Sequence, residues 1–340
     1  MDKAEEKTVV PEKTEETEKT EKIEKTEEIE KTEETEKKEK TEITEKKAAG
    51  RKGWLTMPLY YLEAVAIVLL GQIIGGIFIG IAYALLWILS PAIVESAEWV
   101  TGSMYVMFIG IWLLAVLYTG VFRKNRPILK TAWTGLKGNN WKKLLLGIAV
   151  GFGLNGVCIL VAWLHKDIFL EFDSFRPLSF LIIFVMVFVQ SSAEEFVCRG
   201  LLYQRILGSC GKPAAAIVGN SLLFALLHLG NEGVTVLSLL NIFLSGILFS
   251  LMVYYMDSLW CAFAAHTAWN FTQNILFGLP NSGIVVPYSV FKLDASVAMD
   301  SFAYNVGFGI EGTVVADVVL LLACVTVYLL GRRRAKKAAA

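Results

Sequence analysis

Residues that form redox and metal sites are few in this sequence, and their spacing fits no compact site. The 340 residues contain five cysteines, none in a Cys-x-x-Cys or zinc-ribbon spacing, and three histidines with no His-Glu-x-x-His among them. Most of the cysteines fall within apolar segments, where cysteine packs as a small apolar side chain. We therefore assign the cysteines no redox or metal-binding role.

Charged residues are also scarce beyond the first 50 residues. Apolar side chains make up 55% of the chain, aromatic side chains make up 12%, and the mean hydropathy is +0.53. Such a composition excludes a soluble globular domain, and several apolar runs are long enough to cross a bilayer. The sequence therefore predicts an all-α, polytopic membrane helix bundle.

The formal net charge of zero hides two segments of opposite charge. Residues 1–50 carry 12 lysines against 18 Asp and Glu, net −6, and the remainder carries 20 Lys and Arg against 14 acids, net +6. Residues 12–47 repeat variants of Glu-Lys-Thr-Glu-Glu with almost no apolar side chains. We expect a low-complexity tail, disordered or transiently helical, with a partner-binding arm as the alternative. Its acidity argues against nucleic-acid binding, and it lacks the features of a secretory signal.

Eight apolar runs predict about eight transmembrane helices. Their bounds are near 60–89, 103–122, 143–164, 178–207, 213–229, 234–256, 259–277 and 311–331. Basic residues cluster before the first run, after the second and after the last, at Arg51, Lys52, Arg123, Lys124, Arg126, Lys130, Lys137, Lys142, Lys143, Arg332, Arg333, Arg334, Lys336 and Lys337. By the positive-inside rule both termini are cytoplasmic, which agrees with an even number of spans. The simple membrane body without organelle signals favours a bacterial plasma membrane.

The run over 178–207 contains Glu194, Glu195 and Arg199 in its interior. Ionisable groups at that depth cost about 2.5–3.5 kcal/mol each on insertion scales, and a chain that retains them usually uses them. Glu195 and Arg199 are four residues apart and share a helix face, whereas Glu194 points about 100° away. The spacing predicts an ion pair of Glu195 with Arg199 and leaves Glu194 as a general base that faces a cavity. A purely structural ion pair is the alternative.

Two of the three histidines fall in later apolar runs. His228 lies near the end of the run over 213–229, and His266 is four residues before Asn270 on the same helix face. Either histidine alone is more often a packing residue. If the run enters from the cytoplasm, His228 lies about 22 Å along it, far from the middle of the membrane. Either that span begins deeper, or residues 230–233 form a turn within the protein that lines a watery cavity.

Together these motifs resemble those of the CPBP family of intramembrane proteases, the CAAX protease and bacteriocin-processing (Abi) family. The family pattern is Glu-Glu-x-x-x-Arg, Phe-x-x-x-His and His-x-x-x-Asn, which stand here at 194–199, 224–228 and 266–270. The resemblance covers about 178–277 and implies an intramembrane endopeptidase whose peptide or protein substrate is reached from within the membrane. The resemblance also implies the roles of the site residues. Glu194 is the base and His228 is its partner, His266 and Asn270 are the oxyanion donors, and Glu195 and Arg199 are the supporting pair.

The resemblance leaves the catalytic type and the substrate open. An older view of the family makes the glutamate and histidines zinc ligands, and one carboxylate with two dispersed histidines can form a three-ligand site. We favour a metal-independent reaction that requires no cofactor. A catalytically idle immunity or scaffold protein is a further alternative, although no motif residue is missing, and a transporter is disfavoured because internal repeats are not found. Prenylated CAAX tails, peptide pheromones and bacteriocin leaders all remain candidate substrates.

The charge pattern and the apolar runs divide the chain into three parts. Residues 1–50 are expected to form the charged cytoplasmic tail, and residues 54–331 the intramembrane protease domain with its motif core at 178–277. Residues 332–340 are expected to form a basic cytoplasmic tail.

Removal of residues 1–47 is expected to leave cleavage of a short peptide unchanged, because a charged low-complexity segment adds no ordered surface to a buried site. The measurement is kcat/KM of the full-length and truncated proteins on the same peptide. Lower turnover of this peptide would contradict the prediction. A loss confined to a native protein substrate would indicate recruitment by the tail.

Overall fold

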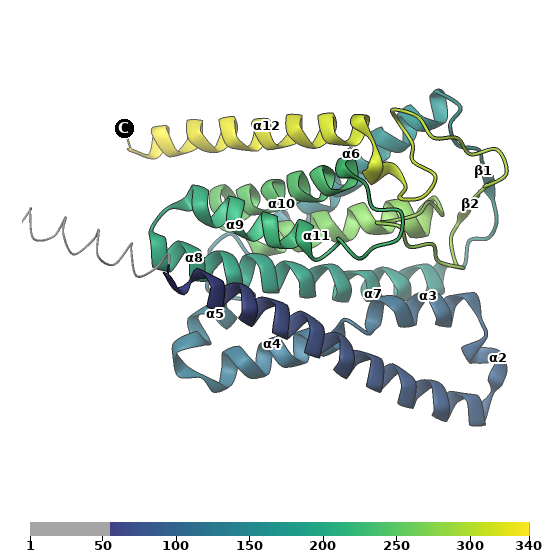
Figure 1. The fold of residues 1–340 in the computed structure, drawn as a ribbon, viewed down its shortest axis with the longest axis horizontal. Coiled ribbons are helices and arrows are strands. Elements are labelled where there is room, and N and C mark those ends of the chain that lie inside the picture. Colours follow the sequence, from purple (N-terminus) through teal and green to yellow (C-terminus); the bar gives the residue numbers. More distant parts are fainter. Residues whose placement is uncertain (1–54, 340) are drawn as a thin grey trace, which may run out of the picture. The chain divides into compact units, whose positions relative to one another are not determined.

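The computed structural model describes residues 55–339, with side chains described up to residue 337. The expected low-complexity tail over residues 1–50 lies outside the described residues. Within the described part almost all regular structure is helical (Figure 1). The expected all-α bundle is therefore confirmed.

Six helices among the described residues are long and apolar enough to cross a membrane. They are Leu55–Leu89, Ala97–Val121, Trp141–Leu164, Pro177–Cys210, Val236–Met256 and Val314–Lys337. In Figure 1 the third, fifth and sixth of these carry the labels α6 (Trp141–Leu164), α10 (Val236–Met256) and α12 (Val314–Ala339). Their length and hydropathy match six of the eight expected spans.

Two of the six long helices are composite. Ala97–Val121 consists of α3 (Ala97–Val106) and α4 (Ile109–Val121). Pro177–Cys210 consists of α7 (Pro177–Glu195), the π-helical segment η2 (Phe196–Leu202) and α8 (Tyr203–Cys210). The second of these is the long helix that carries the first motif.

The expected spans over 213–229 and 259–277 are helical but are shorter or more polar than the other six. α9 (Pro213–Leu226) begins at a proline, which suits the first turn of a helix, and has 14 residues. α11 (Leu259–Asn270) continues as the π-helical segment η3 (Phe271–Leu276), and every residue of α11 except the partly exposed Trp260 is buried. Because protein rather than lipid surrounds α11, the helix tolerates polar side chains that a lipid-facing helix would exclude.

Short elements connect the long helices. They are α2 (Pro91–Val94), η1 (Arg123–Asn125), α5 (Arg126–Thr131), β1 (Leu170–Phe172), β2 (Phe291–Leu293) and η4 (Ile310–Gly312). The two strands pair antiparallel, with Leu170 opposite Leu293 and Phe172 opposite Phe291. This small sheet was not expected, because strands of three residues leave no pattern that apolar runs reveal. It joins the loop before α7 to the loop after η3.

Two glycines of α6 allow α11 to approach closely. A Cβ on Gly147 would overlap the carbonyl oxygen of Cys261, and a Cβ on Gly151 would overlap that of Ala265. Small residues at this spacing let membrane helices pack, since apolar burial alone gives no advantage over contact with lipid. α11 thereby lies at the centre of the bundle, in contact with α6, α7 and α10.

The same device joins the first helix to α4. Gly71 and Gly75 of the helix Leu55–Leu89 cross Gly110, and a Cβ on Gly110 would overlap the carbonyl oxygen of Gly71. A Cβ on Gly75 would overlap the carbonyl oxygen of Met107. The close crossing brings the first helix near α3 and α4, on one side of the site described below.

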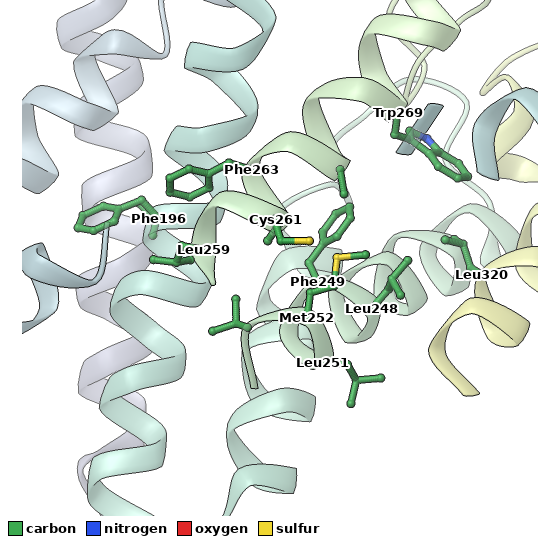
Figure 2. Packing of buried hydrophobic residues seen from close by; sticks show 14 of the residues in the cluster. Phe196, Leu248, Phe249, Leu251, Met252, Leu259, Cys261, Phe263, Trp269 and Leu320 are labelled. Carbon is green, nitrogen blue, oxygen red and sulfur yellow. The ribbon is translucent and has the colours of Figure 1, made fainter. Parts of the chain in front are cut away.

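The main apolar core lies around α11. Phe249 and Met252 of α10, Cys261 and Phe263 of α11, and Phe196 of η2 belong to one buried cluster (Figure 2). By contrast, large apolar side chains are exposed along the outer faces of the long helices, including Leu70, Leu117, Leu181 and Leu321. An apolar exterior around a packed interior is what a bilayer requires, so the chain is a multi-pass membrane protein.

The connections at the two ends of this bundle differ in charge. The helix that starts at Leu55 begins, and α12 ends, at the end where α5 also lies (Figure 1). Three of the basic residues near α5, namely Arg123, Lys124 and Lys130, are therefore at the same end as the basic end of α12. β1, β2 and α2 lie at the opposite end (Figure 1).

Substitution of Gly151 by alanine is expected to lower the melting temperature in detergent, because the new methyl group would overlap the backbone of α11. Gly153→Ala on the same helix is the matched control, since a Cβ at Gly153 meets open space. The measurement is thermal unfolding of both purified variants. Equal melting temperatures for the two variants would contradict the close packing of α6 on α11.

Candidate active site

A cavity of about 410 Å³ lies between the first helix, α3, α7, α9, α10 and α11. Four of the six residues expected in the site line it, namely Glu194, His228, His266 and Asn270. The other two, Glu195 and Arg199, lie behind the cavity wall and are fully buried. The fold thus brings all three motifs to one place, although 76 residues of sequence separate the first from the last member of this set.

The expected ion pair forms within the long helix. Arg199 Nη1 donates to Glu195 Oε1 at 2.8 Å, one helical turn apart, and neither side chain is exposed. The guanidinium group lies over the ring of Phe224, 4.5 Å from its centroid, and 5.5 Å from that of Phe249. Contact with two aromatic faces stabilises a buried cation that has few hydrogen bonds. Nε and Nη2 of Arg199 have no hydrogen-bond partner among the described residues.

A change of helical type accompanies the first motif. α7 ends at Glu195, and residues Phe196–Leu202 continue in π-helical form before α8 begins. A π-helical turn is wider than an α-helical one and is frequent at functional sites. η3 repeats the arrangement directly after Asn270. The helix of the first motif therefore widens within the motif, between Glu195 and Arg199, and the helix of the third motif widens directly after Asn270.

Glu194 has one engaged and one free carboxylate oxygen. Gln190 Nε2, four residues earlier, donates to Glu194 Oε1 at 2.7 Å. Glu194 Oε2 has no hydrogen-bond partner among the described residues, and its distance to His266 Nε2 is 3.9 Å. The free oxygen can accept a proton or a hydrogen bond from a molecule bound in the cavity.

His266 is held at both ring nitrogens. Its Nδ1 lies 3.0 Å from Glu195 Oε1, and its Nε2 lies 3.1 Å from Asn270 Nδ2. A carboxylate only accepts and an amide nitrogen only donates, so Nδ1 carries the hydrogen and Nε2 accepts. The ring also stacks on Phe249, with centroids 5.4 Å apart. The Glu195 carboxylate therefore fixes both the tautomer and the orientation of His266.

Asn270 links His266 to two further amides. Its Nδ2 donates to Gln190 Oε1 at 3.1 Å as well as to His266, and its Oδ1 accepts from Asn281 Nδ2 at 3.3 Å. Both N–H bonds of the Asn270 side chain are thus engaged in the free site. The role of His266 and Asn270 as oxyanion donors stays a prediction.

His228 lies in a turn that follows α9 rather than in the helix itself. α9 ends at Leu226, and the turn that follows carries His228 and Asn231, both of which line the cavity. Of the residues 230–233 that the sequence suggested as a turn, Asn231 lines the cavity, whereas Gly230, Glu232 and Gly233 are exposed. His228 Nδ1 donates to the carbonyl oxygen of Phe224 at 2.7 Å, which leaves Nε2 as an acceptor.

Several polar residues at the cavity were not expected from the sequence, and four of them make hydrogen bonds that matter to the site. These four are Gln190, Asn281, Ser282 and Glu311. Gln190 could have been found, because it interrupts an apolar helix four residues before Glu194, at the spacing that places both on one face. The other three carry no such signal, since they lie in loops and a short 3₁₀ turn outside the motif core.

The donor groups at the cavity do not fit a three-ligand zinc site in this arrangement. Nδ1 of His266 donates to Glu195 and Nε2 accepts from Asn270, so neither ring nitrogen offers a free lone pair. Glu194 Oε2 and His228 Nε2 remain, which are two donors where a catalytic zinc site uses three. Among the described residues no group of three or more His, Cys, Asp or Glu side chains could hold a metal ion.

Arg199→Ala is expected to destabilise the protein by about 3–5 kcal/mol, because it leaves the Glu195 carboxylate buried and unpaired. The measurement is the melting temperature and the yield of folded protein in detergent. Lys292→Ala is the control: Lys292 pairs with Asp173 at 2.9 Å, and its hydrogen bond holds the pKa of that exposed carboxyl below its usual value. The control variant is expected to match the wild type. Equal stability of the two variants would show that the buried pair is not needed for folding.

Comparison with known proteins supports the motif assignment. Residues 176–272 match the family model described as Type II CAAX prenyl endopeptidase Rce1-like. No curated protein and no solved structure matches the chain. The matched range encloses the three motifs that supply Glu194, His228 and His266 to the cavity. The segment that carries these motifs is therefore similar to the Type II CAAX prenyl endopeptidase Rce1-like family.

Proposed function

We propose that this protein is an intramembrane endopeptidase in which Glu194 activates water for hydrolysis of a peptide bond. The observation that carries the proposal is the unpaired Oε2 of Glu194 at the wall of a cavity that His228 and Asn270 also line. A carboxylate with a free oxygen, beside a neutral imidazole nitrogen and amide donors, has the groups that general-base hydrolysis requires. The family match supports the reaction class.

In this mechanism Glu194 and His228 bind the attacking water together. Glu194 Oε2 accepts one proton of the water, while His228 Nε2 accepts a hydrogen bond from the other O–H. The water oxygen then attacks the carbonyl carbon of the peptide bond, and its proton passes from Glu194 to the departing amine nitrogen. The hydrogen bond from Gln190 to Glu194 Oε1 keeps Oε2 directed toward the cavity. The hydrogen bond to the Phe224 carbonyl keeps His228 Nε2 available as an acceptor.

The negative charge on the carbonyl oxygen needs a donor, and Asn270 is the candidate. Its Nδ2 donates to His266 Nε2 and to Gln190 Oε1 in the free site. An oxyanion accepts more strongly than either of these groups, so one N–H can be exchanged to it as charge develops. One such donor contributes about 10² to 10³ in turnover. His266 donates from Nε2 only as an imidazolium, so in its neutral form it acts by holding Asn270.

Glu195 and Arg199 act as the supporting pair in this proposal. Neither lines the cavity, and both are fully buried behind it. Glu195 Oε1 accepts from Arg199 and from His266 Nδ1, so one oxygen connects the cation to the third motif. Their expected effect on the reaction is the position of His266 and, through it, of Asn270.

The proposed reaction requires no metal ion, because Glu194 and His228 supply both acceptors for the water. The substrate is a peptide or protein segment that enters from the membrane, since apolar side chains of the long helices form part of the cavity wall, including Val68, Met104, Phe108 and Ile242. We place both termini in the cytoplasm of a bacterial cell and the helices in its plasma membrane. The basic residues at the end of the bundle where α12 ends support this orientation.

Glu194→Gln is expected to abolish peptide hydrolysis while leaving the protein folded, because the amide keeps the shape of the side chain but cannot take a proton from water. The measurement is turnover of a fluorogenic peptide library by the purified protein, together with its melting temperature. Glu171→Gln on the exposed strand β1 is the matched control and should keep full activity.

Two outcomes would contradict the proposed mechanism. Activity of Glu194→Gln above a few per cent of the wild type would remove Glu194 as the base. Stoichiometric zinc in the purified wild type, lost from His266→Ala together with activity and removed by a chelator, would replace the metal-independent reaction with a zinc-dependent one.

A further inference from the structure

Glu311 is a buried carboxylate at the cavity that no motif includes. It lies in the 3₁₀ turn η4, directly before α12, and 39 residues beyond the end of the family match. Its side chain lines the same cavity as Glu194 and His228 and is 6% exposed. A buried carboxylate in a membrane protein is costly to retain, so its contacts indicate what it contributes.

Both oxygens of Glu311 are fully engaged, and only by donors. Oε1 accepts from Trp269 Nε1 at 3.0 Å and from Asn281 Nδ2 at 3.4 Å. Oε2 accepts from the backbone N–H of Ser282 at 2.5 Å and from its hydroxyl at 2.8 Å. Burial raises the pKa of the Glu311 carboxyl, while the hydrogen bonds from Ser282 and Trp269 oppose that rise. Four donors around two oxygens suit a carboxylate and do not suit an amide.

The contact to Asn281 extends to the candidate oxyanion donor. The same Nδ2 of Asn281 donates to Asn270 Oδ1 at 3.3 Å. Because Glu311 only accepts, the Asn281 amide must present its NH₂ group toward Glu311 and Asn270. Asn270 must then present its oxygen toward Asn281 and its own NH₂ group toward His266 and Gln190. Glu311, acting through Asn281, thereby favours from one side the orientation of the Asn270 amide that His266 Nε2 favours from the other.

The other oxygen of Glu311 holds a strained turn against the second motif. Ser282 has φ +48°, a left-handed conformation that costs a residue with a side chain about 1–2 kcal/mol. Its N–H and hydroxyl are both bound by Glu311 Oε2, and its carbonyl oxygen accepts from Asn231 Nδ2 at 2.9 Å. Asn231 belongs to the turn that carries His228. One carboxylate thus joins the 281–283 turn to the elements that bear the second and third motifs.

We propose that Glu311 is a positioning residue for peptide hydrolysis, which acts through Asn281 to orient the donor amide of Asn270. This proposal rests on the proposed function. Its effect is on the transition state, because a misdirected Asn270 would present its oxygen to the developing oxyanion. Substrate binding is expected to change little.

Glu311→Gln tests the proposal, because an amide at this position supplies an NH₂ group to donors that need an acceptor. We expect kcat to fall about 10²-fold with KM changed less than about twofold. In an Asn270→Ala background the same substitution is expected to change kcat less than about twofold, since the amide that it misdirects is already absent. A merely structural role would lower kcat by the same factor in both backgrounds.

A second variant and a matched control separate orientation from folding. Asn281→Asp keeps the size of the side chain but cannot donate to Asn270 Oδ1, so it should repeat the loss and its dependence on Asn270, even if Glu311→Gln does not fold. Asp317→Asn is the matched control, because it changes another buried carboxylate. Asp317 accepts a hydrogen bond of 3.2 Å from Asn241 and belongs to none of the three motifs, so this variant should leave kcat unchanged.

The outcomes distinguish this proposal from the proposed function. The first case is an active wild type and an inactive Glu194→Gln variant. If Glu311→Gln and Asn281→Asp then keep full activity, or lose the same factor of kcat with and without Asn270, only the role of Glu311 is overturned. A wild type without peptidase activity, or an active Glu194→Gln, overturns the proposed function and with it the role assigned to Glu311.

Discussion

The site depends on the buried pair of Glu195 and Arg199. A lone cation inside a membrane bundle would be expensive, and here one carboxylate and the faces of Phe224 and Phe249 surround it. The same carboxylate oxygen accepts from His266 Nδ1. α7, η2, α9, α10 and α11 therefore meet at one charge cluster, and a shift of α9, α10 or α11 would remove one of the contacts that surround the pair. The positions of the helices around this pair therefore set the geometry of the cavity.

The polar side chains at the cavity form a directed series between two carboxylates. Gln190 donates to Glu194 and accepts from Asn270, which in turn accepts from Asn281, and the same NH₂ group of Asn281 donates to Glu311. Carboxylates only accept, so the two ends fix the orientation of every amide between them. Such full pairing is required where water is scarce, because an unsatisfied polar group in an apolar interior costs several kcal/mol. Among the described residues Glu194 Oε2 has no hydrogen-bond partner, as is also true of Glu195 Oε2 and of Arg199 Nε and Nη2. Of these three side chains only that of Glu194 lines the cavity, and it is the one assigned to the reaction.

Close helix packing and local helix widening act together in this bundle. Gly147 and Gly151 bring α11 against α6, and Gly71 and Gly75 bring the first helix against α4. On the side of the motifs, η2 and η3 open the helices by one residue per turn. Tight contacts on the outer side and wide turns on the inner side leave room for a cavity of about 410 Å³ within an otherwise packed core.

Local sequence determined the helices, the Glu195–Arg199 pair and the three motifs, because each depends on spacing along one helix or on residue type in an apolar run. The turn at His228 was left undecided, since the end of α9 at Leu226 depends on how the following turn packs. The burial of all residues of α11 but Trp260, which allows its polar residues, follows from the helices around it. The roles of Asn281, Ser282 and Glu311 could not be predicted from the sequence. Hydrogen bonds between loops and distant helices produce no regular spacing of residues along the chain. Only the tertiary structure places Glu311, 41 residues after Asn270, at the end of the series that orients this amide.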